Sequence, residues 1–135
     1  MTSGLSSLER AVLEKLLEGN FPLLMLLKQQ LELCEVVKRE FTGVGFYTKF
    51  RIPNDALGVS GLDTKFGDVI GIFPDLQSGA GFLLYVKNGI LDMLEGYTFG
   101  EPWPTSLDRF SLQYIKGENR DWADVPLLLR VPTRK

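Results

Sequence analysis

The chain contains no histidine among its 135 residues. Histidine is the commonest general base in enzymes and the commonest ligand of zinc. A catalytic triad or dyad that needs an imidazole is therefore excluded within this chain. No other complete catalytic motif is present, so we expect no catalytic residue, no metal site and no cofactor.

Cysteine is nearly absent as well, because Cys34 is the only one. A lone cysteine cannot form an internal disulfide, so the fold does not depend on oxidation and suits a reducing compartment. The first residues lack the basic segment and apolar run of a signal peptide. The longest apolar run, 21–27, is far shorter than the ~20 residues of a membrane-spanning helix. We therefore expect a cytoplasmic protein that does not associate with a membrane.

An excess of basic charge is also missing, since 15 lysines and arginines stand against 17 acidic residues and the formal net charge is −2. Proteins that hold nucleic acid through their overall field need a basic surface, so we expect no nucleic-acid partner. The hydrophobic fraction of 44% is typical of a folded chain, and 135 residues are the usual size of one domain. The prediction is a single domain over 1–135.

Two helices are predicted at the beginning of the chain. Ser6 and Glu9 have the spacing of a capping box, in which each side chain accepts a hydrogen bond from the backbone of the other residue. Apolar residues then recur at helical spacing, which predicts a helix over about 6–18. A second, wider apolar stripe, which includes Cys34, predicts a helix over about 21–40.

From residue 41 onward the apolar residues alternate, which is typical of half-buried strands. Asn88 and Gly89 form the strongest short hairpin signal and join two of these strands. The predicted strands are about 43–52, 66–73, 80–87, 90–99 and 109–115. Helices followed by strands, without βαβ alternation, predict an α+β fold. In it, two N-terminal helices pack on one face of an antiparallel sheet of about five strands.

Glu95 is the first candidate site residue. A two-residue turn at 88–89 with an unbroken register places Glu95 and Tyr97 on the same face as Phe82 and Leu84. A carboxylate on an apolar face must be hydrogen-bonded, paired or open to a cavity. In a cavity its pKa would rise, which suits an acid or base role. A structural arginine, loop amides or solvent at the end of the face are the alternatives.

The loop that follows this strand is stiff, because Pro102 and Pro104 flank Trp103. Tryptophan is a favoured anchor of protein interfaces and ligand pockets. Either Trp103 is presented to a partner, or it plugs the end of the core. The candidate binding residues are Tyr47, Glu95, Tyr97, Glu101 and Trp103.

Two strings carry a resemblance to other proteins. They are Gly-Val-Gly-Phe-Tyr-Thr at 43–48 and Leu-Asp-Met-Leu-Glu-Gly-Tyr-Thr-Phe-Gly-Glu-Pro-Trp-Pro at 91–104. Together with the helical segment 8–17, they are similar to a family of small bacterial proteins of unassigned function, some of which resemble the immunity proteins of toxin systems. The resemblance implies one domain and a bacterial, cytoplasmic setting, and it brings no catalytic residues.

These observations favour a non-enzymatic protein-binding module, such as an immunity protein or inhibitor that binds and neutralises a partner protein, for example a toxin. The alternative is a small-molecule-binding or hydrolytic domain that uses Glu95 with the nearby aromatic residues. A third possibility is a homo-oligomer that pairs through sheet edges or faces. The oligomeric state stays open at the level of sequence.

Overall fold

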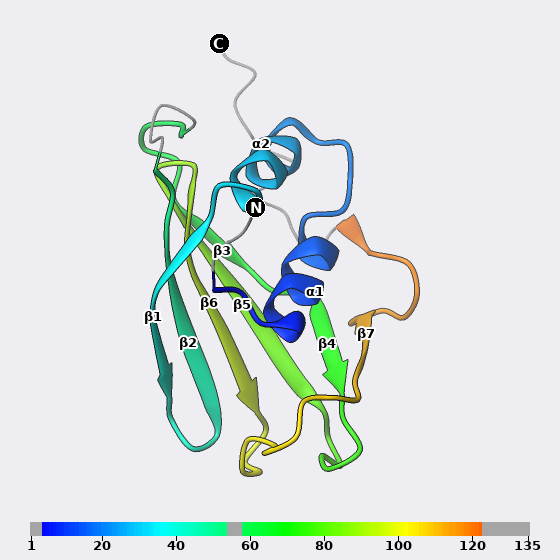
Figure 1. Ribbon diagram of the computed structural model, residues 1–135. Helices are drawn as coiled ribbons and strands as arrows, with labels where there is room; N and C mark the ends of the chain where they lie inside the picture. Colours follow the sequence, from blue (N-terminus) through cyan, green and yellow to red (C-terminus); the bar gives the residue numbers. More distant parts are fainter. Residues whose placement is uncertain (1–3, 54–57, 123–135) are drawn as a thin grey trace.

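The computed structural model describes residues 4–53 and 58–122 of the chain (Figure 1). Within these residues two helices come first and seven strands follow. The helices are α1 (Ser7–Leu16) and α2 (Pro22–Leu31). The strands are β1 (Glu35–Phe41), β2 (Gly45–Arg51), β3 (Thr64–Phe66), β4 (Val69–Ile72), β5 (Ala80–Lys87), β6 (Ile90–Thr98) and β7 (Ser111–Tyr114).

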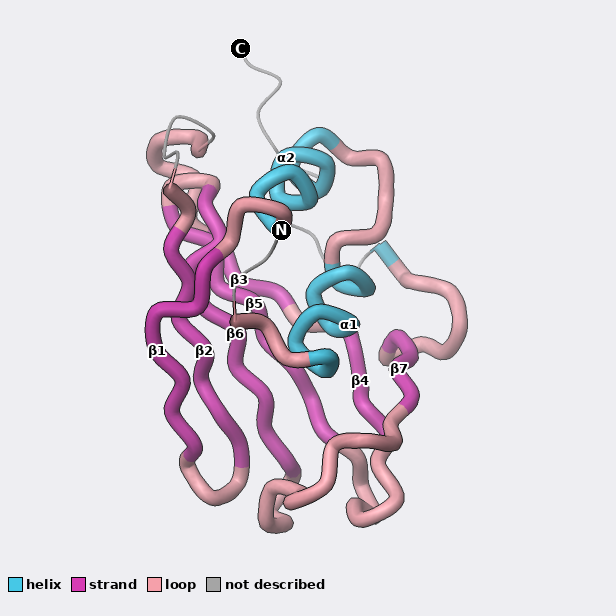
Figure 2. Tube along the Cα trace, viewed as in Figure 1, coloured by secondary structure: helices cyan, strands magenta, loops and turns pink. Residues whose placement is uncertain are grey.

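The strands form one sheet in the order β1-β2-β6-β5-β4-β7, and β3 also pairs with β5. Every pairing between the described strands is antiparallel. Figure 2 shows both helices over the same face of the sheet, and α2 contacts β6 while α1 contacts β4 and β5. The predicted α+β class is therefore confirmed, with seven strands in the described part of the chain rather than about five.

Helix α1 begins as the sequence predicts. Ser6 Oγ accepts from the Glu9 backbone N–H at 3.1 Å, and Glu9 Oε1 accepts from the Ser6 N–H at 2.8 Å. This reciprocal pair is the predicted capping box. The apolar face of the helix, which includes Val12, Leu13 and Leu16, is fully buried in the core.

The second predicted helix, 21–40, is wrong in its second half. Helix α2 ends at Leu31, and residues 35–41 form β1, which pairs with β2 through a hairpin. The β-branched side chains of Val36 and Val37 favour a strand, and pairing with β2 outweighs the helical preference of the surrounding residues. Cys34, which the sequence places on the helical stripe, lies between the two elements and is buried with a free thiol.

The predicted strand 66–73 is divided into two parts. β3 and β4 both pair with β5, and Gly67 and Asp68, which lie between them, belong to neither strand. A Cβ at Gly67 would lie 1.9 Å from the carbonyl oxygen of Phe82, so only glycine allows this approach of the two backbones. At this interruption the Asp68 side chain is buried, with 1% of it exposed.

The four other predicted strands, 43–52, 80–87, 90–99 and 109–115, correspond to β2, β5, β6 and β7. The turn between β5 and β6 is the predicted one, because Asn88 and Gly89 have the positive φ angles, 53° and 70°, of a hairpin turn. Gln30 of α2 is fully buried beside this turn. It donates to the Gly89 carbonyl at 2.8 Å and accepts from the Leu91 N–H at 2.8 Å. The helix thereby holds the hairpin turn in place.

Beyond the first pairs of this hairpin, however, the predicted register is wrong. Tyr85 pairs with Met93, which leaves Asp92 as an extra residue in β6. Such a β-bulge shifts the register by one residue and exchanges the two faces of the strand. Glu95 consequently lies on the face opposite to that of the core residue Phe82, instead of sharing a face with it.

The core lies between the helices and the sheet face that they cover. Phe82, Leu84 and Leu94 of the central strands are fully buried there, together with Leu24 and Leu27 of α2. Within 4–53 and 58–122, no helix has the length and apolar character needed to cross a bilayer.

Candidate protein-binding face

Strands β2, β5 and β6 each have two different sides. Buried residues alternate along them with half-buried or exposed residues, apart from the bulge in β6. The buried set faces the helices, so the other set forms the sheet face that the helices leave uncovered, behind the sheet in Figure 1. We call this set the open face. Its central members are Tyr47, Lys49, Leu83, Tyr85, Met93, Glu95 and Tyr97, and Arg51 and Lys87 continue the set at the ends of β2 and β5.

Glu95 lies at the centre of the open face. It pairs with Tyr47 of β2 on one side and with Leu83 of β5 on the other. The Tyr85 hydroxyl donates to Glu95 Oε1 at 2.9 Å. Desolvation, this hydrogen bond and the charge of Glu95 together raise the pKa of Tyr85 to about 12. The charge of Glu95 and hydrogen bonding to it also raise the pKa of Tyr47. The carboxylate is thus surrounded by tyrosines.

Tyr97 extends this aromatic surface along β6. It lies opposite Gly81 of β5, and a Cβ at Gly81 would meet the Tyr97 ring at 2.5 Å, so the ring lies directly over the glycine. The ring of Phe99 follows in edge-to-face geometry, with its centre 5.7 Å from that of Tyr97. Because Phe99 is 56% exposed, the aromatic surface continues beyond the end of β6.

Lysines border the open face. Lys49 Nζ lies 2.8 Å from Asp92 Oδ1, and Lys65 Nζ of β3 lies 5.9 Å from the centre of the Tyr85 ring. Lys38 of β1 pairs directly opposite Lys49. Like charges in directly opposite positions on adjacent strands are unfavourable by themselves. Charged residues therefore flank the aromatic surface on two sides. Lys38 and Lys49 lie on its β1–β2 side, where Asp92 pairs with Lys49, and Lys65 lies on its β3 side, beyond β6 and β5.

The structure brings together three of the five predicted binding residues. These are Tyr47, Glu95 and Tyr97. Glu101 lies in the loop after β6, where its carboxylate accepts from the backbone N–H groups of Gln77 and Ser78, each at 3.1 Å. It holds this loop against the turn between β4 and β5, away from the three others.

Trp103 lies on the helix-covered side of the sheet. Its ring centre is 5.2 Å from that of Phe46 and 5.9 Å from that of Phe73, and it packs against the core. Its backbone N–H donates to the Gly43 carbonyl at 2.8 Å. Of the two alternatives for Trp103, the structure shows the one in which the indole closes the end of the core.

Sequence reasoning missed a buried polar cluster around Glu9. This carboxylate is 2% exposed and accepts from Arg39 Nε at 2.8 Å, from Arg39 Nη2 at 2.6 Å, from the Thr48 hydroxyl and from the Ser6 N–H. Burial alone raises the pKa of Glu9, but these hydrogen bonds and the Arg39 charge outweigh burial, and the pKa is lowered. The acceptor positions of Glu9 are filled, so its role is structural.

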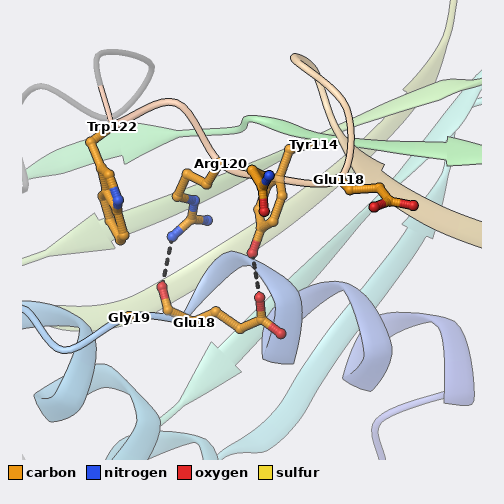
Figure 3. Close-up of a pocket in the computed structure, with 7 residues that line it drawn as sticks. Glu18, Gly19, Tyr114, Glu118, Arg120 and Trp122 are labelled. Carbon is orange, nitrogen blue, oxygen red and sulfur yellow. Dashed lines mark hydrogen bonds between the residues drawn. The ribbon is translucent and has the colours of Figure 1, made fainter.

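A second buried cluster centres on Arg120, which also escaped sequence reasoning (Figure 3). Its guanidinium forms a bidentate pair with Asp68, with Nε–Oδ2 at 2.7 Å and Nη2–Oδ1 at 3.0 Å. It also donates to the carbonyl oxygens of Leu16 and Glu18 at 2.7 and 2.8 Å. The last carbonyls of a helix lack partners and carry partial negative charge. Arg120 therefore caps α1 and neutralises Asp68.

A cavity of about 430 Å³ lies beside this second cluster and is drawn in Figure 3. Tyr114 in its wall donates to Glu18 Oε1 at 2.6 Å, and burial followed by this bond raises the pKa of Tyr114. The Arg120 guanidinium lies 4.8 Å from the ring centre of Tyr114 and 5.1 Å from that of Trp122. Tyr114, Glu18, Arg120 and Trp122 contact one another, so we assign these wall residues a structural role.

Within residues 4–53 and 58–122, no group of three or more histidine, cysteine, aspartate or glutamate side chains is placed to hold a metal ion. A scan against protein-family models, a search of curated proteins and a search of solved structures each found no match to the chain. The resemblance of 43–48 and 91–104 to a bacterial family therefore stays a prediction.

Proposed function

We propose that the protein is a non-enzymatic binding protein that recognises a partner protein through the open face. In its most specific form, the protein is an immunity protein or inhibitor of the bacterial cytoplasm, and binding neutralises a toxin. The observation that carries the proposal is the composition of the uncovered sheet face. There Tyr47, Tyr85 and Tyr97 lie with Leu83 and Met93 around one carboxylate.

These residue types support recognition of a protein. Tyrosine and methionine are enriched in protein interfaces, and a tyrosine loses little conformational entropy when it is buried. The solvent-facing side of an antiparallel sheet is usually polar, whereas the centre of this face is mainly aromatic and apolar. The lysines at its border add charge, which favours encounter with an acidic partner and fixes its orientation. An aromatic centre with a charged rim is the usual anatomy of a recognition surface.

The alternative function, a small-molecule or hydrolytic site at Glu95, requires a recess around this carboxylate. Glu95 instead lies among tyrosines on the open face. Glu95 lines neither the cavities beside Arg120 and Arg39 nor the hollow of about 340 Å³ beside Tyr85 and Lys65. No observation of its own favours chemistry at Glu95, so protein binding is the function that the geometry supports best.

The proposal is tested by affinity capture from cells of the native host with the folded chain and two matched variants. Met93→Lys places a charge in the middle of the open face. Met25→Lys places the same charge on α2, where Met25 is 51% exposed. We expect the parent chain and Met25→Lys to capture a partner in stoichiometric amount, and Met93→Lys to lose it. Equal capture by both variants, or no stoichiometric partner at all, contradicts the proposal.

The immunity form of the proposal has its own test. The captured partner is expressed in a sensitive bacterium with the parent chain, with Met93→Lys or with Met25→Lys. We expect partner expression alone to stop growth, and the parent chain and Met25→Lys to restore it. If the partner is harmless by itself, the immunity function is wrong while protein binding stands. If the captured molecule is a second copy of this chain, the homo-oligomer alternative replaces both.

A further inference from the structure

A second, smaller cavity lies on the helix-covered side of the sheet, between the first turn of α1, strand β1 and the loop after β6. Its volume is about 230 Å³, and its wall is mainly apolar. The apolar part of the wall consists of Leu8, Phe41, Phe46, Trp103 and Leu107. Because Phe46 belongs to the covered side of β2, this cavity is separate from the open face.

The shape and size of the cavity limit what it can hold. Phe46 forms an edge-to-face pair with Trp103 and a tilted pair with Phe41, at centre distances of 5.2 and 6.4 Å. Phe46 is buried and forms the inner wall with Trp103, whereas Phe41 is 63% exposed and lies at the solvent side of the cavity. Pockets for drug-sized ligands have volumes of roughly 300–1,000 Å³, so this cavity suits a smaller occupant of about ten non-hydrogen atoms.

One cationic group, Arg39, also lines the cavity. Its Nε and Nη2 atoms donate to the two carboxylate oxygens of Glu9, and Nη2 also donates to the Gly4 carbonyl at 2.8 Å. Within the described part of the chain, Nη1 of Arg39 has no hydrogen-bond partner. Glu9 thus holds the guanidinium in one position, and the N–H groups of Nη1 can donate to a ligand.

Glu9 also lines the cavity, but it cannot serve as the ligand's partner in the same way. Its oxygens already accept from Arg39, from the Thr48 hydroxyl and from the Ser6 N–H. Among the described residues that line the cavity, the free hydrogen-bonding groups therefore include two donors, which are Nη1 of the cationic Arg39 and the buried, unpartnered Nε1 of Trp103. Because Glu9 occupies the Nε/Nη2 fork, the Nη1 donor complements a carboxylate through a single charge-assisted hydrogen bond.

We propose that this cavity binds a small apolar carboxylate, such as a medium-chain fatty acid or a compact aromatic acid. Its hydrocarbon part lies between Phe46, Trp103 and Leu107, and its carboxylate accepts from Nη1 of Arg39. Binding is independent of the partner at the open face, because the two surfaces lie on opposite sides of the sheet.

The test uses octanoate as the probe and Trp103 as the reporter. Trp122 lies in a different part of the fold, so Trp122→Phe leaves Trp103 as the only one of the two tryptophans. We expect octanoate to change the Trp103 fluorescence saturably, and calorimetry on the parent chain to give the same affinity. Octan-1-ol should bind at least about tenfold more weakly, and octylamine should not bind. Equal binding of octanoate and octan-1-ol overturns the carboxylate assignment.

Two variants locate the site, and thermal unfolding checks that each is folded. Leu107→Trp fills the cavity and should abolish octanoate binding in calorimetry, whereas Leu62→Trp, a half-buried loop leucine elsewhere, should not. Arg39→Lys retains the charge but cannot pair with Glu9 and present a second, fixed donor at the Nη1 position, so it should reduce the preference for octanoate over octan-1-ol. No saturable binding of octanoate to the parent chain, or undiminished binding to Leu107→Trp, overturns the proposal.

Discussion

The Tyr85 hydroxyl donates to Glu95 Oε1 at 2.9 Å, and this hydrogen bond joins two neighbouring strands on the open face. Tyr85 lies opposite Met93, so the bond runs diagonally from β5 to β6. It exists because the bulge at Asp92 moves Glu95 to the same face as Tyr85. The ionisation of Tyr47 and Tyr85 is thereby coupled to the charge of Glu95. The contact between these side chains can therefore be tested by measuring the tyrosine pKa values in solution.

Glu95→Gln is expected to lower the pKa of both Tyr47 and Tyr85. The negative charge of Glu95 disfavours a tyrosinate beside it, and the amide carries no such charge. The pKa of Tyr85, about 12 in the parent chain, should stay above its ordinary value in the variant, because desolvation is the first cause of its shift. Ultraviolet absorbance of tyrosinate as a function of pH measures the change, and Tyr47→Phe and Tyr85→Phe assign the two transitions.

Tyr114 and Asp108 provide controls for this titration. The pKa of Tyr114 is raised by burial and by Glu18, so it should not move in Glu95→Gln. Asp108→Asn removes an exposed carboxylate from a loop and should leave the Tyr47 and Tyr85 transitions unchanged. A Tyr85 transition that is the same in the parent chain and in Glu95→Gln would show that the hydrogen bond across the open face is absent.

Gln30→Leu is expected to destabilise the fold by about 2–4 kcal/mol. The substitution leaves the Gly89 carbonyl and the Leu91 N–H without their buried partner, and each unsatisfied group costs about 1–3 kcal/mol. Gln29→Leu is the matched control, because Gln29 is the exposed neighbour on the same helix. Urea unfolding measures both changes. In Gln30→Leu, hydrogen exchange at the Leu91 amide should accelerate by more than the change in global stability explains. Equal stability of the two variants would show that the hydrogen bonds from Gln30 to the hairpin turn do not stabilise the fold.

Arg120→Lys is expected to cost about 3 kcal/mol although it keeps the charge. A lysine cannot form the bidentate pair with Asp68 and reach the carbonyls of Leu16 and Glu18 at the same time. Arg109→Lys, at an exposed loop position, should change stability by less than about 0.5 kcal/mol. Chemical denaturation gives both values, and a tolerated Arg120→Lys would mean that the fork geometry is not needed.

Local patterns predict much of this fold. The capping box at Ser6 and Glu9 and the turn at Asn88 and Gly89 each depend on neighbouring residues, and both are confirmed. The change from helix to strand, predicted at residue 41, instead lies between Leu31 and Glu35. The bulge in β6 exchanges the predicted faces, although the sequence holds a signal for it. Leu91 and Leu94 are both buried, and an uninterrupted strand cannot direct residues three apart to one side.

The candidate site was predictable only in part. Sequence reasoning named Tyr47, Glu95 and Tyr97, but alternation alone placed Glu95 and Tyr97 on the core face. They share the open face with Tyr47 because β2 pairs with β6 and because of the bulge at Asp92. The buried polar clusters depend on contacts between distant residues, as in the Asp68–Arg120 pair, whose members are 52 residues apart. A charged residue in a polar stretch carries no local sign that tertiary packing will bury it. Such pairs are therefore found from coordinates.

Glu9 makes the stability of the fold depend on pH in the acidic range. Its pKa in the folded chain is lowered from the ordinary value of 4.5, so the folded state binds the proton less readily than the unfolded state does. Its stabilising contribution is complete above about pH 4.5 and is lost as the pH falls through the lowered pKa. The free energy of unfolding of the parent chain should therefore fall with pH in this window.

Glu9→Gln should remove this part of the pH dependence and cost about 2 kcal/mol at neutral pH, because the charge-assisted bonds from Arg39 and Thr48 are weakened. Glu14→Gln is the matched control on the same helix, since Glu14 is exposed and forms a surface pair with Arg10. It should cost less than about 0.5 kcal/mol and keep the slope of the parent chain. Urea unfolding between pH 3 and pH 7 measures all three chains. If the slope of Glu9→Gln equals that of the parent, the carboxylate is not held ionised by Arg39 in the folded state.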